Sequence, residues 1–233
     1  MAVDRRAEIA ANLEAVERRI AAACAAAGRR SEEITLVAVT KTFPASDVRL
    51  LASLGVTHIG ENRDQEAAPK AAAASDLDLT WHFVGQLQTN KCRSVASYAH
   101  VVHSIDRPRL VGALGREARR AGRVIRCLVQ VCFDAEPGRG GAAPSAVPAL
   151  ADEVAAEEGL ELGGVMTVAP LDENPDPAFA ALADLAAEVR AAHPRATTIS
   201  AGMTGDLESA MAHGATLVRL GTALLGTREA IVR

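Results

Sequence analysis

The stretch ITLVAVTKTFP, residues 34–44, places a run of apolar and β-branched residues directly before a lysine, Lys41. A short apolar run of this kind, closed here by Pro44, is typical of a strand buried in a parallel sheet. Seven similar runs follow, at 57–60, 80–85, 101–105, 124–132, 162–168, 197–200 and 216–220. Segments of helical length, rich in Ala, Leu, Glu and Arg, follow the runs at 45–54, 62–74, 88–97, 107–121, 144–158, 176–192, 205–213 and from 222 onward.

This alternation of strand and helix predicts an α/β fold, with a parallel sheet and helices packed outside it. Eight such units in 233 residues favour a single (β/α)8 TIM barrel, for which about 250 residues are typical. We therefore expect one domain over residues 1–233. The alternative is an open doubly wound sheet, but no GxGxxG fingerprint leads a strand into a helix, which disfavours a dinucleotide-binding domain.

The segment before the first strand, residues 3–27, has the spacing of a helix. Apolar residues recur there at intervals of four, three and four, and they line one face: Ile9, Leu13, Val16 and Ile20. Gly28 is expected to end this helix. The sequence thus predicts an extra N-terminal helix, within residues 1–28, that packs on the barrel.

Composition excludes several classes of function. Hydrophobic residues make up 49% of the chain, the net charge is −4, and acidic and basic residues are interspersed, so we expect no nucleic-acid or membrane-surface partner. The chain has no apolar run long enough for a membrane helix and no signal-peptide pattern at its N-terminus. The four cysteines form no CxxC pair and no zinc-ligand spacing, which is typical of a cytoplasmic protein with reduced thiols: Cys24, Cys92, Cys127 and Cys132.

Lys41 is the first candidate functional residue, because side chains at the C-terminal ends of barrel strands form the active sites of such folds. The simple alternative is a lysine that marks the end of a strand and extends into solvent. The strand before it is apolar throughout, so we expect the ammonium group to leave a partly dry barrel mouth. Desolvation there would lower its pKa, as a Schiff-base lysine requires.

The last two strands offer a second candidate site. In VRLGTALLG, 218–226, a strand runs into Gly221 and Thr222 and then into a helix, whose free N–H groups favour an anion. In SAGMTGD, 200–206, Thr204 is expected at the N-terminus of the helix that follows Gly205. Loops after strands 7 and 8 are the usual phosphate site of these barrels. The alternative is that both threonines are plain helix caps.

Arg219 lies within the last strand, two residues before Gly221. If its side chain faces inward, it is a buried cation that needs a partner, such as a phosphate or a ring nitrogen; if it faces outward, it packs among the helices. In a closed barrel the last strand lies beside the first, so Lys41, Arg219 and the Gly221–Thr222 turn should converge. A reactive amine, a phosphate site and a cation between them match pyridoxal 5′-phosphate (PLP).

Several motifs resemble one family along nearly the whole chain, in order: VAVTKTFP, IGENRDQE, WHFVGQLQTNK, VVHSID, GVMTVAP and SAGMTGDLESAMAHGATLVRLGTALLG. They are similar to the YggS-like pyridoxal phosphate homeostasis proteins. That family resembles the N-terminal barrel of alanine racemase, a fold type III PLP domain.

The resemblance implies a role for each matching residue. It implies that Lys41 holds PLP as a Schiff base, and that Arg219 faces the pyridine nitrogen. It further implies that the phosphate is bound by Thr204, Gly221 and Thr222, and that the cofactor is lined by Asn62 and Met203.

The chain departs from the family's pattern in two segments. The family's usual Met-Gly-Met-Ser-x-Asp run is replaced here by one that contains Ala201, Thr204 and Gly205. Thr204 keeps the hydroxyl, whereas Ala201 and Gly205 leave the geometry of the phosphate loop open. Cys132 stands where the fifth strand of the family usually ends in asparagine, and Arg139 stands where the following loop usually has a lysine.

Three functions compete. The leading one is a PLP homeostasis protein that holds the cofactor without turnover and hands it to apo forms of PLP-dependent enzymes, and we expect it to be a monomer. The second is a weak PLP-dependent amino-acid racemase, which needs a second base. The single tyrosine, Tyr98, lies in a helical segment, and we expect His82 to be a hydrogen-bonded barrel residue instead of that base. The third is a phosphosugar enzyme that uses Lys41 as an aldolase-type lysine.

Overall fold

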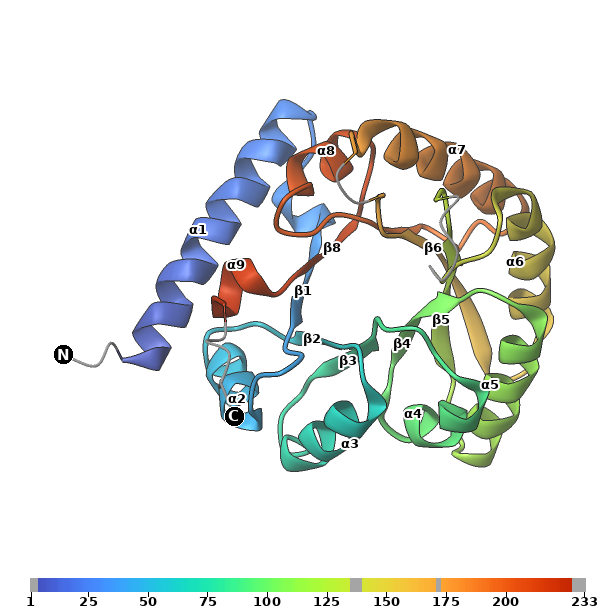
Figure 1. Ribbon diagram of the computed structural model, residues 1–233, viewed down its shortest axis with the longest axis horizontal. Helices are drawn as coiled ribbons and strands as arrows, with labels where there is room; N and C mark the ends of the chain where they lie inside the picture. The colour runs from blue at the N-terminus through green and yellow to red at the C-terminus, as the bar shows by residue number, and fades with distance from the viewer. Residues whose placement is uncertain (1–3, 135–139, 171–172, 228–233) are drawn as a thin grey trace.

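Eight parallel strands close into one barrel in a computed structural model of the chain (Figure 1), which describes residues 4–134, 140–170 and 173–227. Each strand pairs with the next along the chain, and β8 pairs with β1. The strands are β1 Thr35–Val39, β2 His58–Glu61, β3 Thr80–Phe83, β4 Val101–Ile105, β5 Ile125–Val131, β6 Leu160–Thr167, β7 Thr198–Ser200 and β8 Leu217–Leu220. The predicted (β/α)8 barrel is confirmed, and the open sheet is excluded.

The helices form a ring outside the strands (Figure 1). They are α1 Arg5–Ala26, α2 Ala45–Ser53, α3 Asp64–Ala73, α4 Cys92–Tyr98, α5 Pro108–Arg120, α6 Val147–Ala156, α7 Asp176–Ala192, α8 Leu207–Ala212 and α9 Thr222–Leu225. Most bounds agree with the sequence prediction within a few residues. The starts of α4 and α6 differ more, because short 3-10 helices, Thr89–Lys91 and Pro144–Ala146, precede them.

The extra N-terminal helix α1 lies against α8 and α9 outside the barrel (Figure 1). The four predicted face residues are all buried: Ile9, Leu13, Val16 and Ile20. After the last helical residue, Gly28 takes a φ of 65°, a conformation that suits glycine and allows the chain to turn towards β1.

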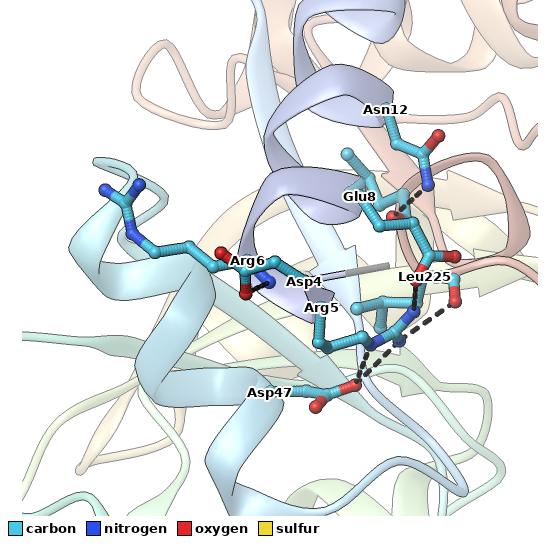
Figure 2. Close-up of polar contacts among 8 residues, drawn as sticks. Asp4, Arg5, Arg6, Glu8, Asn12, Asp47 and Leu225 are labelled. Carbon is cyan, nitrogen blue, oxygen red and sulfur yellow. Dashed lines mark hydrogen bonds and ion pairs between the residues drawn. The ribbon is translucent and has the colours of Figure 1, made fainter. Parts of the chain in front are cut away.

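Polar contacts join α1 to the C-terminal end of α9 (Figure 2). The Arg5 guanidinium donates to the Leu225 carbonyl at 3.0 Å and to Asp47 Oδ2 of α2 at 2.7 Å. The Asn12 amide donates to the Leu224 carbonyl at 3.0 Å. The last carbonyls of a helix have no partner within it, so these two side chains fix the position of α9.

The core is built from Val, Leu, Ile and Ala between the strands and the helices. All four cysteines are free, three of them buried, as expected of small hydrophobic residues. Among the described residues, no helix is long and apolar enough to cross a membrane. No group of three or more His, Cys, Asp or Glu side chains in the same described part is arranged to hold a metal ion.

Candidate functional site

The pairing of β1 with β8 brings together the two ends of the chain that carry the candidate residues. Val37 is in register with Arg219 and Ala38 with Leu220. The next residue, Gly221, lies so close to β1 that a Cβ atom there would be 3.1 Å from the Val39 carbonyl oxygen. Lys41 follows β1 by two residues. Lys41, Arg219 and the Gly221–Thr222 turn therefore lie at one place on the barrel, at the C-terminal ends of the strands.

Lys41 differs from the other two lysines of the chain in its surroundings. Lys70 is buried with its ammonium 2.5 Å from Glu61, and Lys91 forms an ion pair with Asp64 at 3.7 Å. Within the described part of the chain, Lys41 is the one lysine without an ion pair, and its side chain is exposed. The expectation of a partly dry environment is wrong, because the Lys41 side chain is exposed although Thr40 before it is fully buried. The amine is instead free and accessible.

A buried ion pair contacts Thr40, the residue before Lys41. Lys70 Nζ donates to Glu61 Oε1 at 2.5 Å and to the Thr40 carbonyl at 2.7 Å. Thr40 Oγ1 donates to the same Glu61 oxygen at 2.6 Å. Burial raises the pKa of the Glu61 carboxyl, and the hydrogen bonds from Lys70 and Thr40 oppose this effect. These contacts join the ends of β1 and β2 to α3, and they fix the backbone next to Lys41.

The residue after Lys41 has a strained backbone. Thr42 has a φ of 69°, in the left-handed region that β-branched residues rarely adopt. Its N–H donates to Glu66 Oε2 at 2.8 Å, which helps to hold that conformation. Strain of this kind is concentrated at functional sites, where the surrounding structure maintains it.

The two predicted phosphate loops differ in the structure. Helix α9 begins at Thr222 with Gly221 before it, as predicted. Helix α8, however, begins only at Leu207, and Thr204 lies in the turn before it, so the predicted helix start at Thr204 is wrong. The reason is Asp206, whose Oδ1 accepts the Met203 N–H at 2.5 Å and closes a separate turn first.

The loop that carries Met203 and Thr204 is held at both sides. On one side, the Gly202 carbonyl accepts the N–H of Arg219 at 3.0 Å. On the other, Arg19 of α1 donates to the Thr204 carbonyl at 3.0 Å. Helix α1 therefore contacts this loop as well as α9.

Arg219 faces the interior of the barrel and is 5% exposed. Nη1 donates to Ser200 Oγ at 2.5 Å, and Nη2 donates to the Thr167 carbonyl at 2.8 Å. Burial lowers the pKa of the guanidinium to about 10, so it stays protonated at neutral pH. A guanidinium has five N–H donors, and the two acceptors named here leave others for a ligand.

Asn62 follows β2 at the same end of the barrel as Lys41. Its Oδ1 is buried and has no hydrogen-bond partner within the described part of the chain. Gly85 packs directly on the Asn62 backbone, since a Cβ atom there would lie 2.0 Å from the Asn62 carbonyl oxygen. A buried acceptor without a partner carries a free-energy cost, which a donor on a ligand would relieve.

The positions that depart from the family's pattern have different surroundings, and Arg139 lies outside the described residues. Ala201 is buried and its N–H donates to the Leu217 carbonyl at 3.1 Å. A Cβ atom at Gly205 would have no other atom within 4 Å. Cys132 is partly buried, and its thiol donates to the Asp134 carbonyl at 3.4 Å.

The tyrosine and the histidine considered as a second base lie elsewhere. Tyr98 is the last residue of α4, in the outer helical layer, and burial raises the pKa of its phenol. His82 is a hydrogen-bonded barrel residue, as expected, in contact with His58 and His103. Sequence reasoning missed that these three histidines form one line; the available signal was a histidine on each of three consecutive strands.

The alanine racemase N-terminal domain family matches residues 11–229. The pyridoxal phosphate homeostasis protein of Mycobacterium tuberculosis is 46% identical over 245 residues, which cover 97% of this chain and 95% of that protein. The protein of the same description from Escherichia coli is 36% identical, with 95% of this chain and 97% of that protein covered.

Solved structures agree with these sequence matches. PipY of Synechococcus elongatus PCC7942, solved with PLP bound, is 33% identical with a TM-score of 0.82, covering 94% of this chain and all of that chain. The alanine racemase of Corynebacterium glutamicum is 16% identical with a TM-score of 0.66, covering 94% of this chain and 63% of that one, so it shares the fold. From its sequence, its barrel and these relatives, the chain belongs to the pyridoxal phosphate homeostasis protein family, whose barrel is of the alanine racemase N-terminal type.

Proposed function

We propose that the chain binds PLP at the C-terminal mouth of its barrel and serves in PLP homeostasis, with Lys41 as the covalent anchor. The observation that carries this proposal is the free amine of Lys41 beside the turn between β8 and α9, with Arg219 buried next to them. PLP itself supplies an aldehyde that forms a Schiff base with an amine, together with a phosphate and a pyridine nitrogen. PipY, a relative 33% identical in sequence, has been solved with PLP bound.

The residues present fit this cofactor. The start of α9 at Gly221 and Thr222 offers unpaired N–H groups and a hydroxyl to a phosphate, and Thr204 offers a second hydroxyl. The buried Asn62 Oδ1 lacks a donor, which a ligand at this mouth would supply. Asn62 and Met203 are both partly buried, as expected of side chains that line a ligand.

Arg219 favours holding the cofactor over converting a substrate. Its guanidinium keeps its proton, so it donates a hydrogen bond to a pyridine nitrogen without protonating it, which limits the electron withdrawal by the ring. Tyr98, the only tyrosine, lies in the outer layer of helices and does not supply a second base. We therefore assign no turnover to the chain. Weak amino-acid racemisation is the alternative, which the alanine racemase domain match supports.

The proposal extends to the partners, the oligomeric state and the cellular compartment of the protein. A single domain over residues 1–233 would hold PLP and release it to apo forms of PLP-dependent enzymes. A monomer is supported because Val124 is the one exposed large hydrophobic residue in the described part of the chain. Four unpaired cysteines suit a reducing compartment such as the cytoplasm.

The first experiment records the visible absorption spectrum of the purified protein with and without added PLP. We expect a yellow band in the wild type and in Lys91→Ala, and none in Lys41→Ala. Borohydride reduction followed by peptide mass spectrometry then identifies the modified residue, and with three lysines in the chain the result is unambiguous. A wild type that stays colourless, or a label on Lys70 or Lys91, would refute the anchor. Assays with L- and D-alanine test the racemase alternative.

A further inference from the structure

A line of hydrogen-bonded side chains crosses the inside of the barrel from Arg219 to the N-terminal ends of the strands. Arg219 Nη1 donates to Ser200 Oγ at 2.5 Å, and Ser200 Oγ lies 3.0 Å from His103 Nδ1. His103 Nε2 lies 2.9 Å from His82 Nδ1. His82 Nε2 lies 2.9 Å from His58 Nδ1. Ser200 Oγ takes part in two links, and His103 and His82 each use both ring nitrogens, so the line is continuous.

The two inner histidines are neutral. His103 is fully buried and His82 is 2% exposed. Burial, with smaller effects in the same direction from His58 and His100, lowers the pKa of His82 to about 3. Burial also lowers the pKa of His103, with smaller effects in the same direction from His82 and Arg219. A neutral imidazole has one donor and one acceptor nitrogen, so each ring passes a hydrogen bond along in a fixed direction.

One direction of the line gives every polar hydrogen in it an acceptor, beginning with Arg219, which only donates. Ser200 Oγ accepts from Arg219, and its own hydrogen then goes to His103 Nδ1. His103 therefore donates from Nε2 to His82, and His82 donates from Nε2 to His58 Nδ1. In this arrangement each group of the line has a partner, and His58 keeps its proton on Nε2.

The outer end of the line reaches a cavity at the N-terminal mouth of the barrel. This cavity has a volume of about 740 Å³, and both His58 and His82 line it. His58 is half-buried, and burial lowers its pKa below the usual value. The other titratable and charged groups of the cavity are Arg29, Glu33, His100, Arg126 and Glu161.

We propose that Ser200, His103 and His82 are positioning residues that couple the protonation of His58 to the hydrogen bond between Arg219 and Ser200. A protonated His58 donates from both nitrogens, so His82 and His103 must accept from the His58 side and carry their protons on Nδ1. His103 then donates to Ser200, whose oxygen accepts two bonds and whose hydroxyl hydrogen no longer has His103 Nδ1 as its acceptor. The protonated state holds one proton more than the neutral state, taken up from solvent, and each inner ring exchanges its proton on Nε2 for one on Nδ1. Every other group of the line keeps its charge.

When His58 is protonated, Ser200 Oγ accepts hydrogen bonds from both Arg219 and His103. The hydrogen bond from Arg219 is therefore weaker than when His58 is neutral. The guanidinium is left freer to donate to a ligand. That Arg219 donates to the pyridine nitrogen of PLP rests on the function proposed above. The coupling between His58 and Arg219 is a property of the cofactor-free protein.

The test uses the cofactor-free protein labelled with ¹⁵N in histidine and arginine. Above the His58 transition, we expect NMR to show His82 and His103 protonated on Nε2. As the pH falls below about 6.5, the ordinary pKa of histidine, the Arg219 side-chain resonances should shift with the same midpoint as those of His58. An Arg219 signal that stays constant through the His58 transition, or Nδ1 protonation of both inner rings at high pH, would overturn the proposal.

Two variants cut the line, and a third is the matched control. In His82→Phe and in Ser200→Ala, His58 should still titrate while the Arg219 shift disappears; the second variant removes a single oxygen and serves if the first fails to fold. His100→Asn keeps an acceptor for the Trp81 N–H, which His100 Nδ1 accepts at 2.9 Å, and it should leave the Arg219 shift intact. A shift that persists when the line is cut contradicts the coupling.

A second readout uses the PLP-loaded protein. The absorption band should shift with the His58 midpoint in the wild type and lose that dependence in Ser200→Ala. The two proposals fail separately. A protein that binds no PLP refutes the proposed function and leaves the NMR result to decide the coupling, whereas PLP binding with a constant Arg219 signal refutes the coupling alone.

Discussion

The buried pair of Lys70 and Glu61 makes the strongest prediction about stability. Lys70→Met removes the cation that neutralises a fully buried carboxylate, together with the hydrogen bond to the Thr40 carbonyl. Breaking a buried ion pair from one side typically costs about 3–5 kcal/mol, because the remaining charge is left without compensation. Since domains are stable by only about 5–15 kcal/mol, we expect Lys70→Met to lose a large part of the total.

Two further variants separate the causes of this loss. Thr40→Val removes only the hydroxyl that donates to Glu61, and it should cost about 1–3 kcal/mol. The double variant Glu61→Leu, Lys70→Met replaces both charges with apolar groups, and it should recover most of the stability lost in Lys70→Met. Urea unfolding measures all of them through the fluorescence of Trp81, the only tryptophan, which lies buried on β3.

The pH dependence of the free energy of unfolding gives a second measure of what the loss of Lys70 costs. Burial raises the folded-state pKa of Glu61. A carboxyl with a raised pKa contributes stability that is fully present below its unfolded pKa of about 4.3 and is lost as the pH rises through the folded value. Without Lys70 this loss should grow, so Lys70→Met should be closest to the wild type at low pH. A cost below about 1 kcal/mol at neutral pH, or no recovery in the double variant, would refute the reasoning.

Three further predictions concern the surroundings of the site. Thr42→Gly should stabilise the protein by up to about 1 kcal/mol in urea unfolding, because glycine adopts the φ of 69° without strain; a loss of stability would contradict this. Asn12→Ala removes the bond to the Leu224 carbonyl and should cost about 1 kcal/mol in the same assay, and an unchanged urea midpoint would show that α9 is held without it. Gly221→Ala places a methyl group 3.1 Å from the Val39 oxygen, so it should cost about 1–3 kcal/mol and weaken inorganic phosphate binding in calorimetry; equal phosphate affinity would exclude this turn as the phosphate site.

The barrel was predictable because each strand and each helix has its own local signal. The apolar run before Lys41 and the apolar face of α1 both follow from spacing in the sequence alone. The closure of the barrel was predictable as well, and it brings Arg219 next to β1.

Local side-chain contacts were harder to predict. The start of α8 was misplaced because Asp206 binds the Met203 N–H and keeps Thr204 in a turn. The exposure of Lys41 was misjudged because a turn begins directly after the buried Thr40, with Lys41 exposed in it and Thr42 at positive φ. Both outcomes depend on single hydrogen bonds and torsion angles that a residue pattern does not specify.

The hydrogen-bonded line of histidines depends on the register of the strands. His82 and His103 lie on neighbouring strands, whereas Ser200 is 97 residues from His103 along the chain. Which of their nitrogen and oxygen atoms meet is set by the tilt and stagger of the closed barrel. A sequence pattern therefore identifies the histidines as barrel residues but does not order them.

Helix α1 has a consequence for how the protein is made. Arg5 contacts Leu225, a residue 220 positions later, and Arg19 contacts the loop at Thr204. The first residues of this helix emerge from the ribosome long before α9 has been synthesised. The turn at Gly221 and Thr222 therefore reaches its final position only after synthesis has passed the last strand. A nascent chain that ends before the last strand would have Lys41 without Arg219, Gly221 and Thr222, which we propose as the other parts of the cofactor site.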